Sequence, residues 1–236
     1  MLAEFVRETA VFNITLSPEQ INQFERYQTL LLDWNQRMNL TAIREPRQIQ
    51  QRHFLDALTC SLVTGDLNGR SLIDVGTGAG FPGLPLKILF PDMRLTLVES
   101  VVKKTHFLEV VVAELGLRDV VIVPERAELL GQDVAHRAQY DWAVARAVAE
   151  LRILVEYLLP LCRLGGFVLA QKGAGAAEEV AAAGRAMVEL GGTVRPLFPV
   201  NLPQRKETHY LVVVEKTAVT PDTYPRRIGV PAKKPL

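Results

Sequence analysis

Cysteine and histidine are scarce in this sequence. Its 236 residues include two cysteines, Cys60 and Cys162, which lie far apart and form no CxxC pair. Two isolated thiols fit a protein of the reducing cytosol better than a disulfide framework. No cluster of further ligands accompanies His53, one of four histidines, so we expect no bound metal.

Long apolar runs and an excess of one charge are also missing. No apolar segment is long enough to span a bilayer, and the first residues carry acids where a signal peptide would begin with bases. We therefore expect a cytoplasmic protein that does not contact membranes, and a monomer. The formal net charge is only +1, so any RNA binding must come from a local basic patch.

Hydrophobic residues make up 48% of the chain, enough to fill a core, and their rhythm changes near residue 70. Before that point the pattern is helical. Ser17 and Pro18 begin a helix with Gln20 placed for a capping box, and apolar residues recur at helical spacing as far as Trp34. A second helix is expected over residues 47–63. The sequence therefore predicts a helical N-terminal extension over residues 1–68.

From residue 71 onward, short apolar strands alternate with helices. Strands are expected at 71–75, 95–98, 120–123, 141–145, 167–171 and 209–215, and helices at 82–90, 102–115, 150–159 and 176–190. This alternation predicts an α/β fold over residues 69–216, a Rossmann-like parallel sheet with helices on both faces. Residues 217–236 hold four basic residues against one acid and several prolines, so we expect a basic, extended C-terminal tail.

A glycine-rich loop, DVGTGAGFPG at residues 74–83, joins the first of these strands to a helix. Glycines at the carboxyl edge of a parallel sheet let a ligand approach the backbone. The last three glycines satisfy the dinucleotide fingerprint GxGxxG. In that fingerprint, however, the first glycine directly follows the strand. Here Gly76 directly follows the strand, and if the fingerprint is counted from Gly76, its third glycine position is occupied by Phe81. The in-phase pattern, acid-x-Gly-x-Gly-x-Gly, resembles the first motif of the class I methyltransferases, which bind S-adenosylmethionine.

Polar residues follow the strands at the same edge. Asp74 can organise the loop, or reach the amino group of the cofactor through water. Glu99 follows the second strand and can accept the ribose hydroxyls of an adenosine cofactor, a feature that NAD enzymes share. Ala127 and Glu128 follow the third strand, where adenine would lie. Arg146 ends the fourth strand, where it either faces the transferred methyl group or forms a surface salt bridge.

Several separated segments resemble the bacterial small-subunit ribosomal RNA (guanine-N7) methyltransferases, known as the RsmG or GidB family. They are WN and MNLT within 34–41, RHFLD at 52–56, the loop at 74–83, KK and FL within 103–108, RAE at 126–128, RA at 146–147, KG at 172–173 and YPRR at 224–227. The combination of WN, MNLT and HxxD ahead of the loop is more specific than the loop itself. The chain departs from the family at Ala57, where a serine is common, at Glu99, often Asp, and at His209, often Arg.

The resemblance implies S-adenosylmethionine as cofactor and, as substrate, N7 of a guanine in the 16S rRNA of the small ribosomal subunit. It also implies a set of cofactor contacts, namely Gly76, Phe81, Ala127, Glu128 and Arg146. Asp74, Gly78 and Glu99 complete the cofactor-binding candidates from the loop and the second strand.

The chemistry of this reaction needs no general base, because guanine N7 carries a lone pair and no hydrogen. Alignment of the reacting atoms then supplies most of the rate enhancement. We assign the orienting role to Arg146, whose guanidinium suits the O6 and N7 edge of guanine. Arg126 and Lys172 are expected near RNA phosphates. Phe81 either stacks on a flipped base, or packs only on the cofactor or in the core.

The extension offers further candidates for RNA contact. His53 shares a helix face with Asp56, three residues on, and the pair either lines the site or forms a structural hydrogen bond. The other basic side chains available to RNA are Arg37, Arg44, Arg47, Arg52, Arg226, Arg227, Lys233 and Lys234. Three alternatives stay open: a methyltransferase for a small molecule or protein, an NAD-dependent oxidoreductase, and a non-catalytic RNA-binding module.

Overall fold

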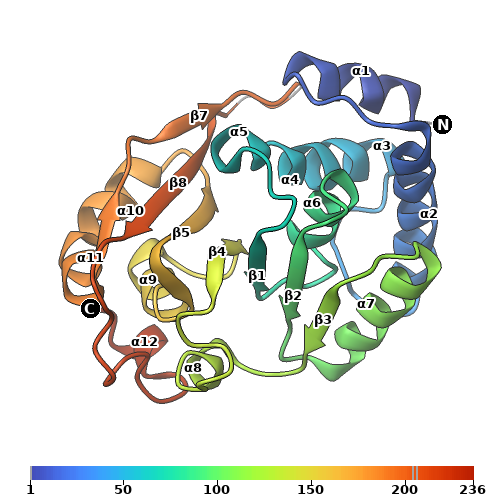
Figure 1. Cartoon of the computed structure of the whole chain (residues 1–236). Helices are drawn as coiled ribbons and strands as arrows, with labels where there is room; N and C mark the ends of the chain where they lie inside the picture. Colours follow the sequence, from blue (N-terminus) through green and yellow to red (C-terminus); the bar gives the residue numbers. More distant parts are fainter. Residues whose placement is uncertain (1, 204, 206) are drawn as a thin grey trace.

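The computed structural model describes residues 2–203, 205 and 207–236, and its centre is one mixed β-sheet (Figure 1). The strands are β1 (Ser71–Val75), β2 (Arg94–Val98), β3 (Val120–Val123), β4 (Tyr140–Arg146), β5 (Cys162–Lys172), β6 (Gly192–Val194), β7 (Phe198–Val200) and β8 (His209–Lys216). Their order is β3-β2-β1-β4-β5-β8-β6, with β7 also beside β8. Strands β1 to β5 pair in parallel, and β8 runs antiparallel to its neighbours.

Helices cover both faces of the sheet, as the alternation of strands and helices predicts (Figure 1). They are α1 (Ala3–Val11), α2 (Pro18–Asn35), α3 (Pro46–Ile49), the π-helical η1 (Gln50–Leu55), α4 (Asp56–Leu58), α5 (Ser61–Thr64), α6 (Gly83–Leu89), α7 (Val102–Glu114), α8 (Ala127–Leu130), α9 (Leu151–Leu158), α10 (Ala176–Ala182), α11 (Gly184–Leu190) and α12 (Val230–Lys233). Since successive strand residues point to opposite faces, Leu72 packs toward the N-terminal helices and Ile73 toward α9 and its neighbours.

The N-terminal helices share a hydrophobic cluster with one face of the sheet. Helix α2 begins with the expected capping box, in which Ser17 and Gln20 exchange hydrogen bonds. Phe24 lies with its ring centroid 5.2 Å from that of Phe5 in α1 and 5.1 Å from that of Phe54 in η1. This aromatic cluster fixes the extension against the loop that follows β1.

Several element predictions were wrong in detail. The single helix expected over 47–63 is divided into α3, η1, α4 and α5, and η1 contains a wider π-helical turn of the kind often found near functional sites. The helix expected over 176–190 is two helices that meet at Gly184, a residue that weakens a helix interior. Strands β6 and β7 were missed, because three residues are too few to show a period.

The C-terminal residues, predicted to be extended, instead fold back onto the domain. Thr220 and Pro225 are buried, and the segment ends in the short helix α12, which packs against α9. None of the helices in the described part of the chain is both long and apolar enough to cross a bilayer.

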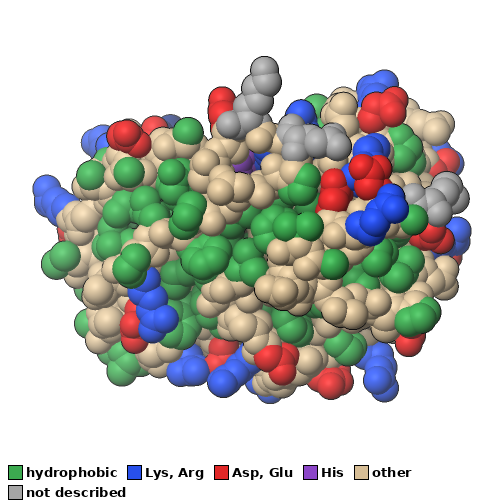
Figure 2. All heavy atoms as spheres, turned by 90° about the horizontal axis from the view of Figure 1, so that it is seen from above, with side chains coloured by type: hydrophobic (Ala, Val, Ile, Leu, Met, Phe, Trp, Pro, Cys, Tyr) green, Lys and Arg blue, Asp and Glu red, His purple; other side chains and the backbone are tan. Residues whose placement is uncertain are grey.

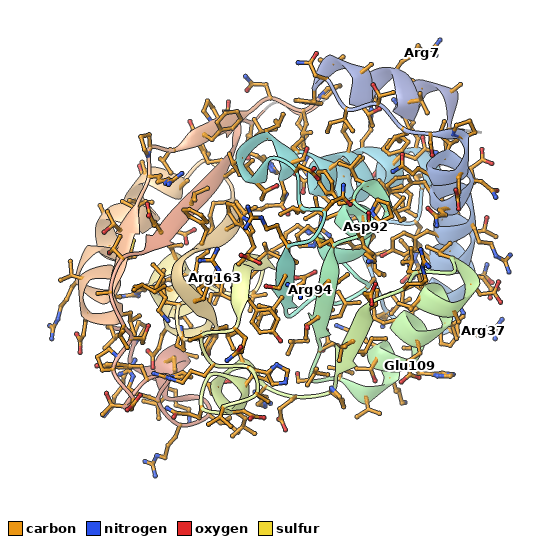
Figure 3. All side chains as sticks on the ribbon, viewed as in Figure 1. Arg7, Arg37, Asp92, Arg94, Glu109 and Arg163 are labelled. Atoms are coloured by element: carbon orange, nitrogen blue, oxygen red, sulfur yellow. The ribbon has the colours of Figure 1, made fainter. Side chains whose placement is uncertain are left out.

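The surface carries charges of both signs side by side. Figure 2 shows one face, on which Lys and Arg side chains are interspersed with Asp and Glu around hydrophobic ones. Arg37 lies 3.1 Å from Asp33 and points outward, away from the sheet (Figure 3).

Candidate active site

Two cavities open where the parallel strands end. The smaller, of about 230 Å³, is the glycine-loop pocket, lined by Val75, Gly76, Val98, Ser100, Glu125, Arg126, Ala127, Glu128, Val148, Ala149, Tyr157 and Ala232. The larger, of about 490 Å³, is the arginine pocket, lined by Ile43, Arg52, His53, Arg146, Ala147, Gln171, Lys172, Gly173, Glu179, Arg205 and His209. The segment 146–149 after β4 contributes to both, so the two cavities adjoin.

Gly76 closes β1 at the wall of the glycine-loop pocket. Its φ of +69° is a conformation that glycine adopts without strain. A Cβ at this position would lie 2.7 Å from Cγ2 of Val148. Glycine is therefore needed here both for the turn and for the close approach of the two walls.

Asp74 holds the loop from inside the sheet. Its side chain is fully buried, and Oδ2 accepts hydrogen bonds from the Thr77 hydroxyl at 2.7 Å and the Gly83 amide at 2.8 Å. Burial raises the pKa of Asp74 to about 6, although both hydrogen bonds oppose the shift. Oδ1 is buried without a partner among the described residues. This geometry matches the loop-organising interpretation of Asp74.

Glu99 ties the tip of the loop to the turn after β2. Its Oε2 accepts from the Gly78 amide at 3.1 Å, and its Oε1 accepts from the Val101 amide at 2.9 Å. Lys104 places its ammonium 3.8 Å from the same carboxylate. The carboxylate is thus held beside Ser100, which lines the glycine-loop pocket.

Glu128 stands at the start of α8, next to Ala127, and both line the glycine-loop pocket. Its Oε1 accepts from the Gly229 amide at 3.0 Å, and it also hydrogen-bonds Tyr157. Burial and this neighbouring carboxylate raise the pKa of Tyr157 to about 12. Arg126 lines this pocket too, apart from the arginine pocket.

Arg146 is fixed by groups from the N-terminal extension. Its Nη1 donates to the Arg52 carbonyl at 3.1 Å and to Oδ2 of Asp56 at 3.3 Å, and its Nη2 donates to Nδ1 of His53 at 3.2 Å. The guanidinium carbon lies 4.9 Å from the centre of the Phe81 ring. The side chain is 15% exposed, so the pair with Asp56 is largely buried instead of lying on the surface.

His53 is held as a neutral ring in one tautomer. Because Arg146 can only donate, Nδ1 accepts, and Nε2–H donates to the Thr41 hydroxyl at 2.7 Å. Burial, followed by the charge of Arg146, lowers the pKa of His53 to about 4. The ring stacks on Phe81 at 4.7 Å between centroids. Both His53 and Asp56 therefore act on Arg146.

The MNLT segment is shaped by Asn35. Its Oδ1 accepts from the amides of Leu40 and Thr41 at 2.9 and 3.0 Å, and its Nδ2 donates to the Thr41 carbonyl at 2.9 Å. This turn aims the Thr41 hydroxyl at His53. The WN, MNLT, HxxD and RA segments, far apart in sequence, thus converge on one guanidinium.

The side chains of Phe81 and Lys172 are already engaged in contacts within the protein, which limits the substrate contacts expected from the sequence. Phe81 is 4% exposed and stacks between His53 and Tyr27, which is the core-packing alternative. Lys172 donates to the Ala149 carbonyl at 2.6 Å and pairs with Glu179 at 2.7 Å. Its ammonium supports the pocket wall, so the expected phosphate contact would have to break an existing ion pair.

A family model described as rRNA small subunit methyltransferase G (GidB) matches residues 20–206. The ribosomal RNA small subunit methyltransferase G of Roseiflexus castenholzii is 53% identical over 99% of each chain, and that of Alkaliphilus metalliredigens is 48% identical over 94% of this chain and 92% of its own. This chain belongs to the rRNA small subunit methyltransferase G family. The resemblance drawn from the sequence motifs is confirmed, and the oxidoreductase alternative is set aside.

The solved structures similar to this family member include methyltransferases. A 16S rRNA (adenine(1408)-N(1))-methyltransferase from Catenulisporales acidiphilia has a TM-score of 0.53 at 18% identity, over 66% of this chain and 88% of its own. Fibrillarin of Aeropyrum pernix, in complex with S-adenosyl-L-methionine, has a TM-score of 0.53 at 16% identity, over 67% and 72% of the two chains. At such identities the likeness shows the fold, which confirms the predicted fold class.

Sequence reasoning about this family member missed two charged residues of the arginine pocket, Arg205 and Glu179, and noted His209 only as a departure from the family. Arg205 and His209 contact each other there, and His209 Nδ1 lies 3.6 Å from Oδ1 of Asp56. Burial alone would raise the pKa of Asp56, but the His209 hydrogen bond and the arginine charges hold it below its usual value. Glu179 was missed because the sequence pattern of a helix acid does not show that it pairs with a lysine at the end of the preceding strand.

Proposed function

We propose that this enzyme transfers the methyl group of S-adenosylmethionine to N7 of a guanine in 16S rRNA of the small ribosomal subunit. The cofactor occupies the glycine-loop pocket and the guanine occupies the arginine pocket. The observation that carries this assignment is that the two cavities adjoin at segment 146–149, where β4 ends. The enzyme acts in the cytoplasm, as a monomer.

The glycine-loop pocket suits the chemistry of the cofactor. Glu128 offers a carboxylate for an amine or hydroxyl group, and Glu99 stands beside the same pocket. A Cβ at Gly76 would clash with Val148 at the wall of this pocket. Gly78 and Ala127 contribute backbone at the loop tip and at the start of α8.

S-adenosylmethionine supplies an electrophilic methyl group on a sulfonium. Arg146 donates to O6 of the guanine and leaves N7 facing the other pocket. His53, neutral with a pKa near 4, and Asp56 keep the guanidinium in that orientation. Since no proton leaves N7 when it attacks, the site works by alignment and needs no base.

Arg52 and Arg205 are the phosphate contacts that the pocket best supports. Arg52 is exposed at the pocket, and Arg205 is half-buried in it beside His209. A flipped nucleotide would bring its phosphates to the mouth, where these guanidiniums lie. Arg126 remains a further candidate, at the glycine-loop pocket.

The test is methyl transfer from radiolabelled S-adenosylmethionine to undermodified small subunits and to their deproteinised RNA, followed by mass spectrometry of the nucleosides. We expect label in 7-methylguanosine. Label in another nucleoside would overturn the N7 assignment. No transfer to either RNA form, with the cofactor still bound, would instead favour a small molecule or protein as substrate.

A further inference from the structure

The C-terminal segment, residues 217–236, lies beyond the part matched by the family model and is anchored at one buried charge. Arg226 donates to Glu156 from its amide at 2.9 Å, from Nε at 2.9 Å and from Nη2 at 2.6 Å. The Glu156 side chain is fully buried. Charge-assisted hydrogen bonds of this kind are stronger than neutral ones. The position of residue 226 is therefore firmly set.

Arg137 supplies a second anchor to the same segment. Its guanidinium donates to the carbonyls of Thr220 at 2.9 Å, Pro221 at 3.1 Å and Tyr224 at 2.7 Å. One side chain thus holds the backbone on both sides of the bend that leads to Arg226. Together the two anchors place the residues after Arg226 beside the glycine-loop pocket.

Beyond the anchors, the last turn of the chain reaches the pocket itself. The Gly229 amide donates to Oε1 of Glu128 at 3.0 Å, from a backbone with φ of +76° that turns the chain into α12. Ala232, exposed at the pocket mouth, is one of its lining residues, and Pro231 beside it is buried. Among the described residues, this turn is linked to Glu128 by one hydrogen bond, from a backbone amide to the side-chain carboxylate.

We infer that residues 229–232 form a wall of the cofactor pocket and position the Glu128 carboxylate within it, an inference that rests on the proposed function. The Gly229 amide and Tyr157 hold Glu128 from two directions, so the carboxylate is oriented before the cofactor arrives.

Two variants release the last turn and keep both anchors. One ends the chain at Ile228; the other, Gly229→Pro, removes the amide donor and forbids the positive φ. We expect each to weaken binding of S-adenosylmethionine about tenfold in calorimetry, the factor that corresponds to roughly one lost hydrogen bond to a charged group. The double variant Lys233→Ser, Lys234→Ser, which keeps Gly229 and Ala232, is the matched control and should bind as the parent does.

Hydrogen exchange measures whether the cofactor site protects the last turn, which a change in overall stability would not reproduce. S-adenosylhomocysteine should slow exchange of the amides of Gly229, Val230 and Ala232 in the full chain, and melting of the cofactor-free variants should stay close to that of the parent. Variants that bind the cofactor as tightly as the parent, or unchanged exchange, would overturn the inference. Failure of the parent itself to bind S-adenosylmethionine would overturn the proposed function as well.

Discussion

At the scale of single residues, Arg146 is the most constrained side chain of the site. Its position at the end of β4 could be read from the sequence, because a strand end in an α/β fold faces the ligand. Its partners could not be, since His53 and Asp56 lie about 90 positions away along the chain. The sequence set a guanidinium at the edge, and tertiary contacts gave it one orientation.

Replacing Arg146 by alanine should lower the single-turnover rate of methyl transfer about 100-fold, the order seen when one preorganised donor is lost. The family resemblance implies a cofactor contact for Arg146, but Arg146 lines the arginine pocket and not the glycine-loop pocket, so binding of S-adenosylmethionine should change little. Calorimetry beside rapid-quench kinetics separates the two effects. A large loss of cofactor affinity with a normal rate would contradict this division of roles.

The neutral state of His53 should make stability depend on pH. Its pKa falls from 6.5 to about 4 on folding, so the folded state binds fewer protons in that range. The stabilisation is complete above the unfolded value and is lost as pH falls toward 4. Between pH 7 and pH 5 the free energy of unfolding should drop by about 2 kcal/mol through this group. Urea unfolding of the parent and of His53→Gln at both pH values tests this prediction. An equal drop in the free energy of unfolding for the two proteins between pH 7 and pH 5 would refute it.

At the scale of elements, local signals were reliable where they are strong and regular. The capping box at Ser17 and the strands at 71–75 and 120–123 were predicted from neighbouring residues and match the structure. The π-helical η1, which packs against α1, was not predicted, because its residues show no local pattern that sets it apart from an α-helix. Strand β7 needs β8 as its partner, which no local pattern reveals.

Ser17→Ala should lower the free energy of unfolding by about 1 kcal/mol, because it removes the acceptor for the Gln20 amide at the start of α2. Chemical denaturation measures the change. Thr64→Ala is a suitable comparison, since that exposed hydroxyl bonds only to the next residue's carbonyl and should matter far less. A Ser17 variant as stable as the parent would show that tertiary packing alone holds this helix start.

At the scale of the whole molecule, the ion pair between Arg226 and the buried Glu156 is one of the contacts that join the C-terminal segment to the fold. Arg226→Ala leaves the Glu156 carboxylate fully buried and without its charged partner. We expect the free energy of unfolding to fall by about 3–5 kcal/mol. Combining it with Glu156→Gln should recover part of the loss, because the uncompensated charge is gone. No recovery in the double variant would mean that packing, not charge, is what Arg226 supplies.

The sequence by itself determined the alternation of strands and helices, the phase of the glycine loop and the residues at each strand end, because these depend on local periodicity and spacing. The tertiary structure alone decided that the strand ends form two adjoining pockets, that Lys172 is paired with Glu179, and that the basic tail folds back to Glu128. Those outcomes depend on contacts between residues 7 to about 100 positions apart. The composition of the chain and the spacing of its residues do not show which charged residues, far apart in the sequence, become buried next to each other.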